Sequence, residues 1–391
     1  MISHTSLHAH SPLHSPLHSA QHSPLHSPRH SPLRSPLRSH LQLHSRKHIS
    51  CATWLFTIAI LATTATPTFA QRLFRTTTPV EITITTNLKA LLKDRDSTKF
   101  QPHEAAFTYK DDNGQTVTIP VTLRTRGHFR RQARNCDFPP ILVEFKKKAA
   151  NKTLLQGNTR LKLTTNCKPK NNDYEQYVLA EYAVYRVYER LSPMHFRTRL
   201  ARVVYNDSAA AMPSVTSWAF LTEDEKEVAK QVSLLPEKTK GAYFDDLETT
   251  QLATTALFEY MVGNTDWSIA GLHNIALLRD STGNINPVAY DFDWTGVVNP
   301  RYAFPDARLG IKTVTERLYR GPCLTPAQWQ PTFNRFLSAR SAIDSIYKSI
   351  PSLDAKLVKT AIEYYDEFFK TISEPRAAKH AVVDVCLPKG N

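Results

Sequence analysis

Residues 274–294 read NIALLRDSTGNINPVAYDFDW, and this stretch decides how the second half of the chain is organised. Two short apolar runs flank the polar segment 281–284, a pattern that predicts an antiparallel hairpin. In such a hairpin the start of the first strand lies beside the end of the second. The sequence therefore predicts that Asn274 and Asp291 meet at the open end of the hairpin.

Further oxygen-bearing side chains are expected near this end. Asp293 alternates with Asp291, and the polar loop 263–266 (Gly-Asn-Thr-Asp) follows a helical apolar pattern at 247–262. Carboxylate and amide oxygens are the ligands that Mg²⁺ and Mn²⁺ prefer, so Asn274, Asp291 and Asp293 are predicted metal ligands. The alternative is that they are solvated turn residues. Aromatic residues alternate with these acids, however, and an unpaired carboxylate in an apolar neighbourhood costs several kcal/mol.

The first half of the chain reads as strands with one helix. Alternating apolar residues predict the strands, and an apolar stripe predicts the helix at 174–191. The second half is mainly helical, with patterns at 247–262, 326–350 and 353–372 around the hairpin. The fold expected from these elements is α+β. The predicted strands are 81–86, 105–109, 117–123, 141–145, 160–164, 200–205 and 214–221.

Glu181 lies on the apolar stripe of the predicted helix and is therefore expected to need a cation. Lys162 faces away from the apolar side of the strand 160–164, which makes it the predicted partner. Breaking a buried pair of this kind costs about 3–5 kcal/mol. The alternative is that Glu181 lies at the edge of the stripe and reaches water.

A basic turn follows the third predicted strand. Arg126 and Gly127 are expected to bring a guanidinium group and backbone amides close to a phosphate. A plain basic turn is an equally good interpretation. The formal net charge of the chain is +14, yet no nucleic-acid-binding motif accompanies it, so no specific nucleic-acid partner is expected.

The N-terminal 70 residues are predicted to be a leader. Residues 1–40 carry Ser-Pro-Leu-His repeats, which favour a disordered low-complexity segment, with a His-rich metal tract as the alternative. Residues 41–70 have a basic start, an apolar stretch and small residues before Gln71, the pattern of a signal peptide cleaved near Ala70. No later segment is apolar enough to predict a membrane helix, so a secreted or periplasmic location is expected.

Four cysteines follow the predicted signal peptide, and an even number in an exported chain favours two disulfides. Three pairings are open. The favoured one joins Cys136 to Cys167 and Cys323 to Cys386, because each bond then stays within one half of the chain.

Taken in order, these pieces resemble the CotH-like family of atypical kinases, with weaker similarity to HipA-type kinases. The resemblance covers roughly residues 115–300 and implies a two-lobed protein-kinase-like fold, with a strand-rich N-lobe at 71–223 containing one helix and a mainly helical C-lobe at 224–391. The sequence motifs that carry the resemblance are Leu123-Arg-Thr-Arg-Gly127, Leu161-Lys-Leu163, the helix with Glu181, Gly263-Asn-Thr-Asp266, His273-Asn274 and Tyr290-Asp-Phe-Asp293.

The resemblance also implies a catalytic centre. Asp266 would orient or deprotonate the acceptor hydroxyl, and Asn274 and Asp291 would hold Mg²⁺ or Mn²⁺ on the phosphates of ATP.

On the nucleotide side, the resemblance implies that Lys162, held by Glu181, contacts the α- and β-phosphates. Arg126 and Gly127 would cover the phosphates, and the segment ending at Glu223 would border adenine.

The function expected from this resemblance is transfer of the γ-phosphoryl group of ATP to a protein or small-molecule hydroxyl outside the cytoplasm. Two alternatives stay open: an inactive kinase-like binding or structural module of the cell envelope, and a metal-dependent phosphohydrolase that uses the same acids.

Overall fold

The computed structural model describes residues 72–96, 98–99, 101–388 and 390. The predicted low-complexity leader at 1–40 and the predicted signal peptide at 41–70 lie outside the described residues.

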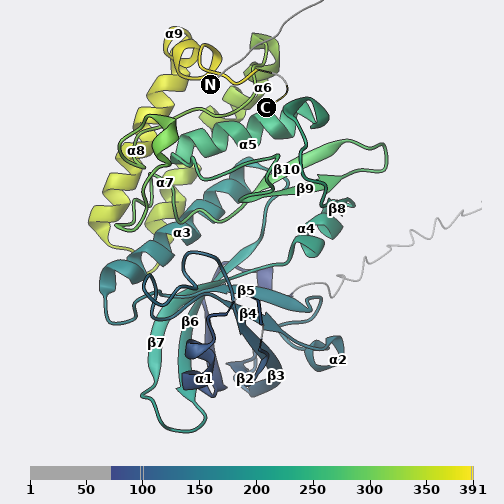
Figure 1. Ribbon diagram of the computed structural model, residues 1–391, viewed down its shortest axis with the longest axis vertical. Coiled ribbons are helices and arrows are strands. Elements are labelled where there is room, and N and C mark those ends of the chain that lie inside the picture. The colour runs from purple at the N-terminus through teal and green to yellow at the C-terminus, as the bar shows by residue number, and fades with distance from the viewer. Residues whose placement is uncertain (1–71, 97, 100, 389, 391) are drawn as a thin grey trace, which may run out of the picture. The chain divides into compact units, whose positions relative to one another are not determined.

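Seven strands of the first half close into a barrel in the order β1-β2-β3-β4-β5-β7-β6 (Figure 1). Strands β1 and β6 pair in parallel, with Val80 opposite Ala201, and every other neighbouring pair is antiparallel. Closure leaves the sheet without an unpaired edge. The strands are β1 Val80–Thr86, β2 His103–Lys110, β3 Thr116–Thr125, β4 Ile141–Glu144, β5 Arg160–Thr164, β6 Thr198–Asp207 and β7 Val215–Thr222.

The barrel strands form because their apolar residues recur at every second position. In β5, Leu161 and Leu163 are fully buried in the apolar core of the barrel, whereas the intervening Lys162 points to the opposite face. In strands β3 and β4, Arg124 and Leu142 lie in the same cross-strand row as Lys162. The outer face of β5 therefore carries Lys162, the predicted partner of Glu181.

The predicted fold class is wrong. The strands form a closed mixed barrel rather than the sheet of a two-lobed kinase fold, and the described residues of the first half hold three α-helices instead of one. Closure depends on β1 meeting β6, which is more than 100 residues away, and no local pattern reveals such a pairing. Two of the helices are too short to show a helical period. The three are α1 Leu88–Lys93, α2 Lys147–Ala150 and α3 Asn172–Leu191.

The second half is helical around a small sheet with the strand order β10-β9-β8. Helix α5 is buried along most of its length, and its apolar residues share one core with those of α3, α6, α7 and α8. In Figure 1, α3 runs between the barrel and the C-terminal helices. The elements are α4 Glu225–Gln231, β8 Leu235–Glu237, α5 Thr249–Val262, β9 Ile275–Arg279, β10 Ile285–Ala289, α6 Pro326–Ser338, α7 Arg340–Ser349, α8 Ala355–Ser373 and α9 Pro375–Ala378.

Two disulfides, Cys136–Cys167 and Cys323–Cys386, are formed, so the favoured pairing is confirmed. They are compatible with a secreted or periplasmic protein. None of the helices in the described part of the chain combines the length and the apolarity of a membrane span.

Candidate functional site

The hairpin β9–β10 places Asn274 and Asp291 together, as its sequence predicts. Ile275 pairs with Ala289, and the backbone amide of Tyr290 donates to the carbonyl oxygen of Asn274 at 3.0 Å. At the opposite end, the carboxylate of Asp280 accepts hydrogen bonds from the backbone amides of the turn. The two polar side chains therefore share the open end of the hairpin.

Both residues have left-handed backbone conformations, with φ of 54° at Asn274 and 66° at Asp291. Asn and Asp tolerate this region better than most residues, but strained conformations of this kind persist only where the surroundings impose them, and they cluster at functional sites. Here the backbone amide of Asp291 donates to the hydroxyl of Tyr185 in α3 at 2.9 Å. Helix α3 thus helps to hold the turn of the chain that presents the Asp291 carboxylate.

Asp266 comes from the loop after α5 and faces the same end of the hairpin. The helix ends at Gly263, whose φ of 69° is left-handed, and the loop then turns back so that the side chain of Asn264 accepts from the amide of Asp266 at 2.9 Å. The carboxylate of Asp266 accepts from His273 at 3.0 Å and from the side-chain amide of Asn274 at 3.2 Å. The hydrogen bond to Asp266 raises the pKa of His273.

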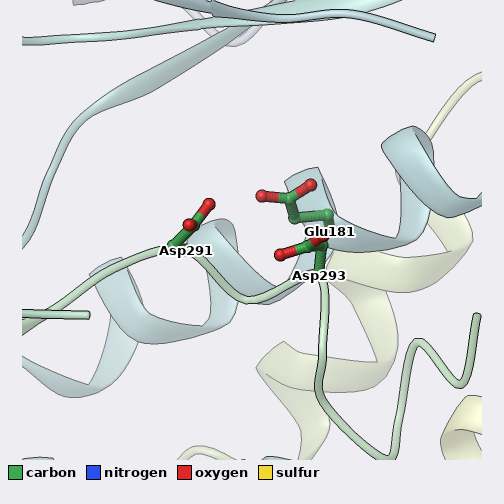
Figure 2. Close-up of side chains that lie close together, drawn as sticks. All are labelled: Glu181, Asp291 and Asp293. Atoms are coloured by element: carbon green, nitrogen blue, oxygen red, sulfur yellow. The ribbon is translucent and has the colours of Figure 1, made fainter. Parts of the chain in front are cut away.

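A buried acidic cluster lies beside this group, and Figure 2 shows its three side chains coming from α3 and from the segment after β10. Ligand oxygens of Glu181, Asp291 and Asp293 all lie within 4.8 Å of one another. Only Asp291 is substantially open to solvent, with 33% of its side chain exposed against 2% for Glu181 and 8% for Asp293. Burial raises the pKa of Glu181 to about 8 and that of Asp293 to about 6, while nearby Arg130 opposes both shifts.

The partner of Glu181 is Arg130, not Lys162. The guanidinium group of Arg130 lies 3.2 Å from Glu181, 3.2 Å from Asp291 and 3.3 Å from Asp293. The predicted Lys162–Glu181 pair is therefore wrong. The physical reason is that a planar guanidinium fork can bond several carboxylates at once, whereas an ammonium group on β5 does not reach them.

Lys162 instead meets aromatic rings. Its Nζ lies 4.6 Å from the ring centre of Tyr290 and 5.2 Å from that of Phe196. Burial and the nearby charge of Arg126 lower the pKa of Lys162 to about 8, while Asp291 favours its charged form. Among the described residues, no carboxylate forms an ion pair with Lys162 or with Arg126, so two cations lie near Asp291 without an acidic partner.

The side chain of Glu223, expected at the adenine-binding segment, is taken up by the protein itself. It is fully buried, pairs with the guanidinium of Arg197 at 2.7 Å and accepts from the side-chain amide of Gln231 at 2.8 Å. Burial raises its pKa, and Arg197 opposes the shift. This carboxylate has a structural partner and is not free to contact a base.

A cleft of about 260 Å³ brings most of the candidate residues together. It adjoins a hollow of about 790 Å³ that shares Asp266, His273 and Trp294 with it. A larger hollow of about 1120 Å³ lies over β2, β3 and β4 and contains none of the acids of the cluster. The residues lining the cleft are Arg126, Gly127, His128, Phe129, Arg130, Pro140, Asp266, His273, Asn274, Asp291, Asp293 and Trp294.

Three contributors were not among the predicted site residues: Arg130, His273 and Tyr185. Arg130 lies in a basic stretch that offers several arginines, and nothing local distinguishes the one that turns inward. His273 directly precedes Asn274, so its position next to the hairpin strand was the available signal. Tyr185 lies on α3 four residues after Glu181 and thus on the same helical face.

The cleft combines oxygen ligands of the kind that divalent cations prefer with cations of the kind that bind phosphate. Comparison with known proteins adds no relative, because neither a family model nor a curated protein matches the chain.

Proposed function

We propose that this chain is an exported kinase that transfers the γ-phosphoryl group of ATP, bound with Mg²⁺ or Mn²⁺, to a hydroxyl of a protein or small molecule. The observation that carries the proposal is the shared cleft, which Asp266, Asn274 and Asp291 line together with Arg126. Kinship with the CotH-like family is part of this proposal.

The oxygen side of the cleft suits a divalent cation. Asp291 is the most exposed carboxylate of the acidic cluster, and Asn274, directly before β9, adds a side-chain amide oxygen. A bound ion would neutralise charge on the phosphates of the nucleotide. Asp293 fits this role less well than its sequence suggested, because it is buried against Arg130 and accepts from the hydroxyl of Tyr302.

The cationic side suits the phosphates. Arg126 lines the cleft. The ammonium group of Lys162 lies over the ring of Tyr290, the residue that precedes Asp291 in the sequence. A desolvated ammonium without an acidic partner is stabilised when an anion binds beside it. The proposal therefore retains a contact of Lys162 with the phosphates, but without an ion pair between Lys162 and Glu181.

Asp266 is the group that would act on the acceptor. Its carboxylate is 41% exposed at the wall shared by the cleft and the adjoining hollow. It would accept the proton of the acceptor hydroxyl while that oxygen bonds to the γ-phosphorus and the bond to the β-phosphate oxygen breaks, with ADP as the leaving group. His273 and Asn274 hold the carboxylate in place.

The test is transfer of label from γ-labelled ATP by the full chain in the presence of Mn²⁺ or Mg²⁺. Asp266→Asn and Asp291→Asn should each reduce transfer by about 10²–10⁴-fold. Asp280→Asn is the matched control, because Asp280 caps the opposite end of the same hairpin. Equal labelling by the wild type and both site variants would exclude the kinase, and phosphate release without a labelled acceptor would identify a phosphohydrolase.

A second candidate is an inactive binding or structural module. It is favoured by Arg130, whose guanidinium group already contacts all three acids of the cluster. In that case ATP with Mn²⁺ should leave the melting temperature unchanged, whereas a kinase should be stabilised by about 2.7 kcal/mol at a ligand concentration of 100 Kd.

A further inference from the structure

The guanidinium group of Arg130 contacts all three carboxylates of the acidic cluster. Its three nitrogens each face a different carboxylate, at 3.2 Å from Glu181, 3.2 Å from Asp291 and 3.3 Å from Asp293. Only 8% of the Arg130 side chain is exposed. A buried cation thus stands where three carboxylates from two separate segments converge.

The cluster has the dimensions of a divalent-cation site. Its ligand oxygens lie within 4.8 Å of one another. Two oxygens on opposite sides of Mg²⁺ are about 4 Å apart, and those around Ca²⁺ about 5 Å apart. One oxygen of Glu181, Oε1, is also buried without a hydrogen-bond partner among the described residues. The guanidinium therefore leaves unused an acceptor that an ion ligated by the same carboxylates would use.

Arg130 lies in the segment between β3 and β4, which is fixed to the rest of the fold by several contacts. Arg95 holds the segment between β3 and β4, because its guanidinium group donates to three backbone carbonyls of that segment, at 3.0 Å to Arg131, 3.0 Å to Cys136 and 2.7 Å to Asp137. The disulfide to Cys167 joins the same segment to the chain that follows β5. The position of Arg130 is thus fixed by the hydrogen bonds of Arg95 and by the Cys136–Cys167 disulfide.

We propose that Arg130 is a built-in cation filling a three-carboxylate site that would otherwise bind a divalent metal ion. The wild-type chain then takes one metal ion fewer than its acidic residues allow, and Arg130 acts as a positioning residue that orients Asp291. The inference deepens the proposed function by limiting the number of metal ions, and rests on it only for the ion expected at Asn274 and Asp291.

The experiment counts bound Mn²⁺ by equilibrium dialysis and electron paramagnetic resonance, without nucleotide. Arg130→Ala should bind one more Mn²⁺ than the wild type, and Arg134→Ala, an exposed arginine of the same segment, should match the wild type. Adding Glu181→Gln to Arg130→Ala should weaken the extra site by about 10-fold or more, because one of its three carboxylates is lost.

Arg130→Met is measured alongside, since it keeps the length of the stem while removing the charge. Mn²⁺ should raise the melting temperature of both Arg130 variants more than that of the wild type. An unchanged Mn²⁺ count in both variants overturns the proposal. An extra Mn²⁺ whose affinity does not change when Glu181→Gln is added also overturns it. Failure of both variants to fold in Mn²⁺ also overturns it, because the ion is expected to replace the guanidinium.

The result is separable from the proposed kinase activity. The ion count involves no ATP, so a chain that gains Mn²⁺ on loss of Arg130 but never transfers phosphate would support this inference and refute the kinase. Phosphate transfer with no gain of Mn²⁺ would do the reverse.

Discussion

The side-chain amide of Asn274 donates to the backbone carbonyl of Asp266 at 2.7 Å and to its carboxylate at 3.2 Å. One amide group therefore joins the start of β9 to the loop after α5 and turns the carboxylate of Asp266 toward the cleft. Because Asn274 itself has a left-handed backbone conformation, the surrounding fold maintains this arrangement against local strain.

Asn274→Asp should abolish most phosphate transfer while leaving the fold intact. The change removes both donors and places a second carboxylate beside Asp266, so the base loses its orientation and gains a repulsive neighbour. We expect transfer from ATP to fall by about 100-fold or more. Thermal unfolding should show a loss of no more than about 1–3 kcal/mol, the range for two hydrogen bonds. Undiminished transfer would show that this contact has no part in catalysis.

Lys162→Met should stabilise the protein and weaken its binding of nucleotide. The pKa of Lys162 is lowered from 10.5 to about 8, so the unfolded chain holds more protons between these values and the wild type gains stability as pH rises through that window. Below about pH 8 the lysine is charged in both states, and the cost of burying that charge is fully present.

At neutral pH, Lys162→Met should therefore raise the free energy of unfolding by about 1–3 kcal/mol, which denaturant titration at several pH values can measure. The rise in stability between pH 8 and 10.5 should flatten in the variant. A variant less stable than the wild type at pH 7 would contradict this account of Lys162.

Glu181→Gln should flatten the pH dependence of the free energy of unfolding between pH 4.5 and about 8. Burial raises the pKa of Glu181 from 4.5 to about 8, so the folded state keeps a proton that the unfolded chain releases. The wild type should then lose stability as pH rises from 4.5 to 8, by up to about 1.4 kcal/mol per pH unit for one proton. Glu189→Gln, at a more exposed position of α3, is the control. An identical slope in wild type and Glu181→Gln would refute the prediction.

Replacement of Cys323 and Cys386 by serine should destabilise the fold by about 4 kcal/mol, because their disulfide closes a segment of 63 residues and restricts the unfolded chain. The Cys136–Cys167 bond, with a separation of 31 residues, should contribute slightly less by the same argument. Thermal unfolding with and without reductant measures both effects, and non-reducing peptide mapping verifies the pairs. A mapped pairing of Cys136 with Cys323 would contradict the structure.

Local patterns were sufficient where neighbouring residues decide the structure. The hairpin around the turn at Asp280 and the convergence of Asn274 with Asp291 follow from alternation, turn residues and antiparallel register. The disulfide pairs also followed from the simplest division of the chain. Closure of the barrel did not, because it depends on the parallel pairing of β1 with β6.

The ion pairs of the site were harder to predict than its backbone. Glu181 was correctly expected to be buried and to need a cation, yet Lys162 and several arginines could all have supplied one. Which of them reaches the carboxylate depends on the path of the segment between β3 and β4, and that path is set by Arg95 and the Cys136–Cys167 bond.

By itself, the sequence determined the kinds of side chain available, the hairpin that joins Asn274 to Asp291 and the burial of an acid on α3, because each of these depends on periodicity over a few residues. Only the tertiary structure decided that the strands close into a barrel and that Arg130, not Lys162, contacts the three acids of the cluster. The physical reason is that closure and charge pairing are settled between segments far apart in the chain, where the path of each segment decides which cation reaches the carboxylates and a planar guanidinium can bond several of them at once.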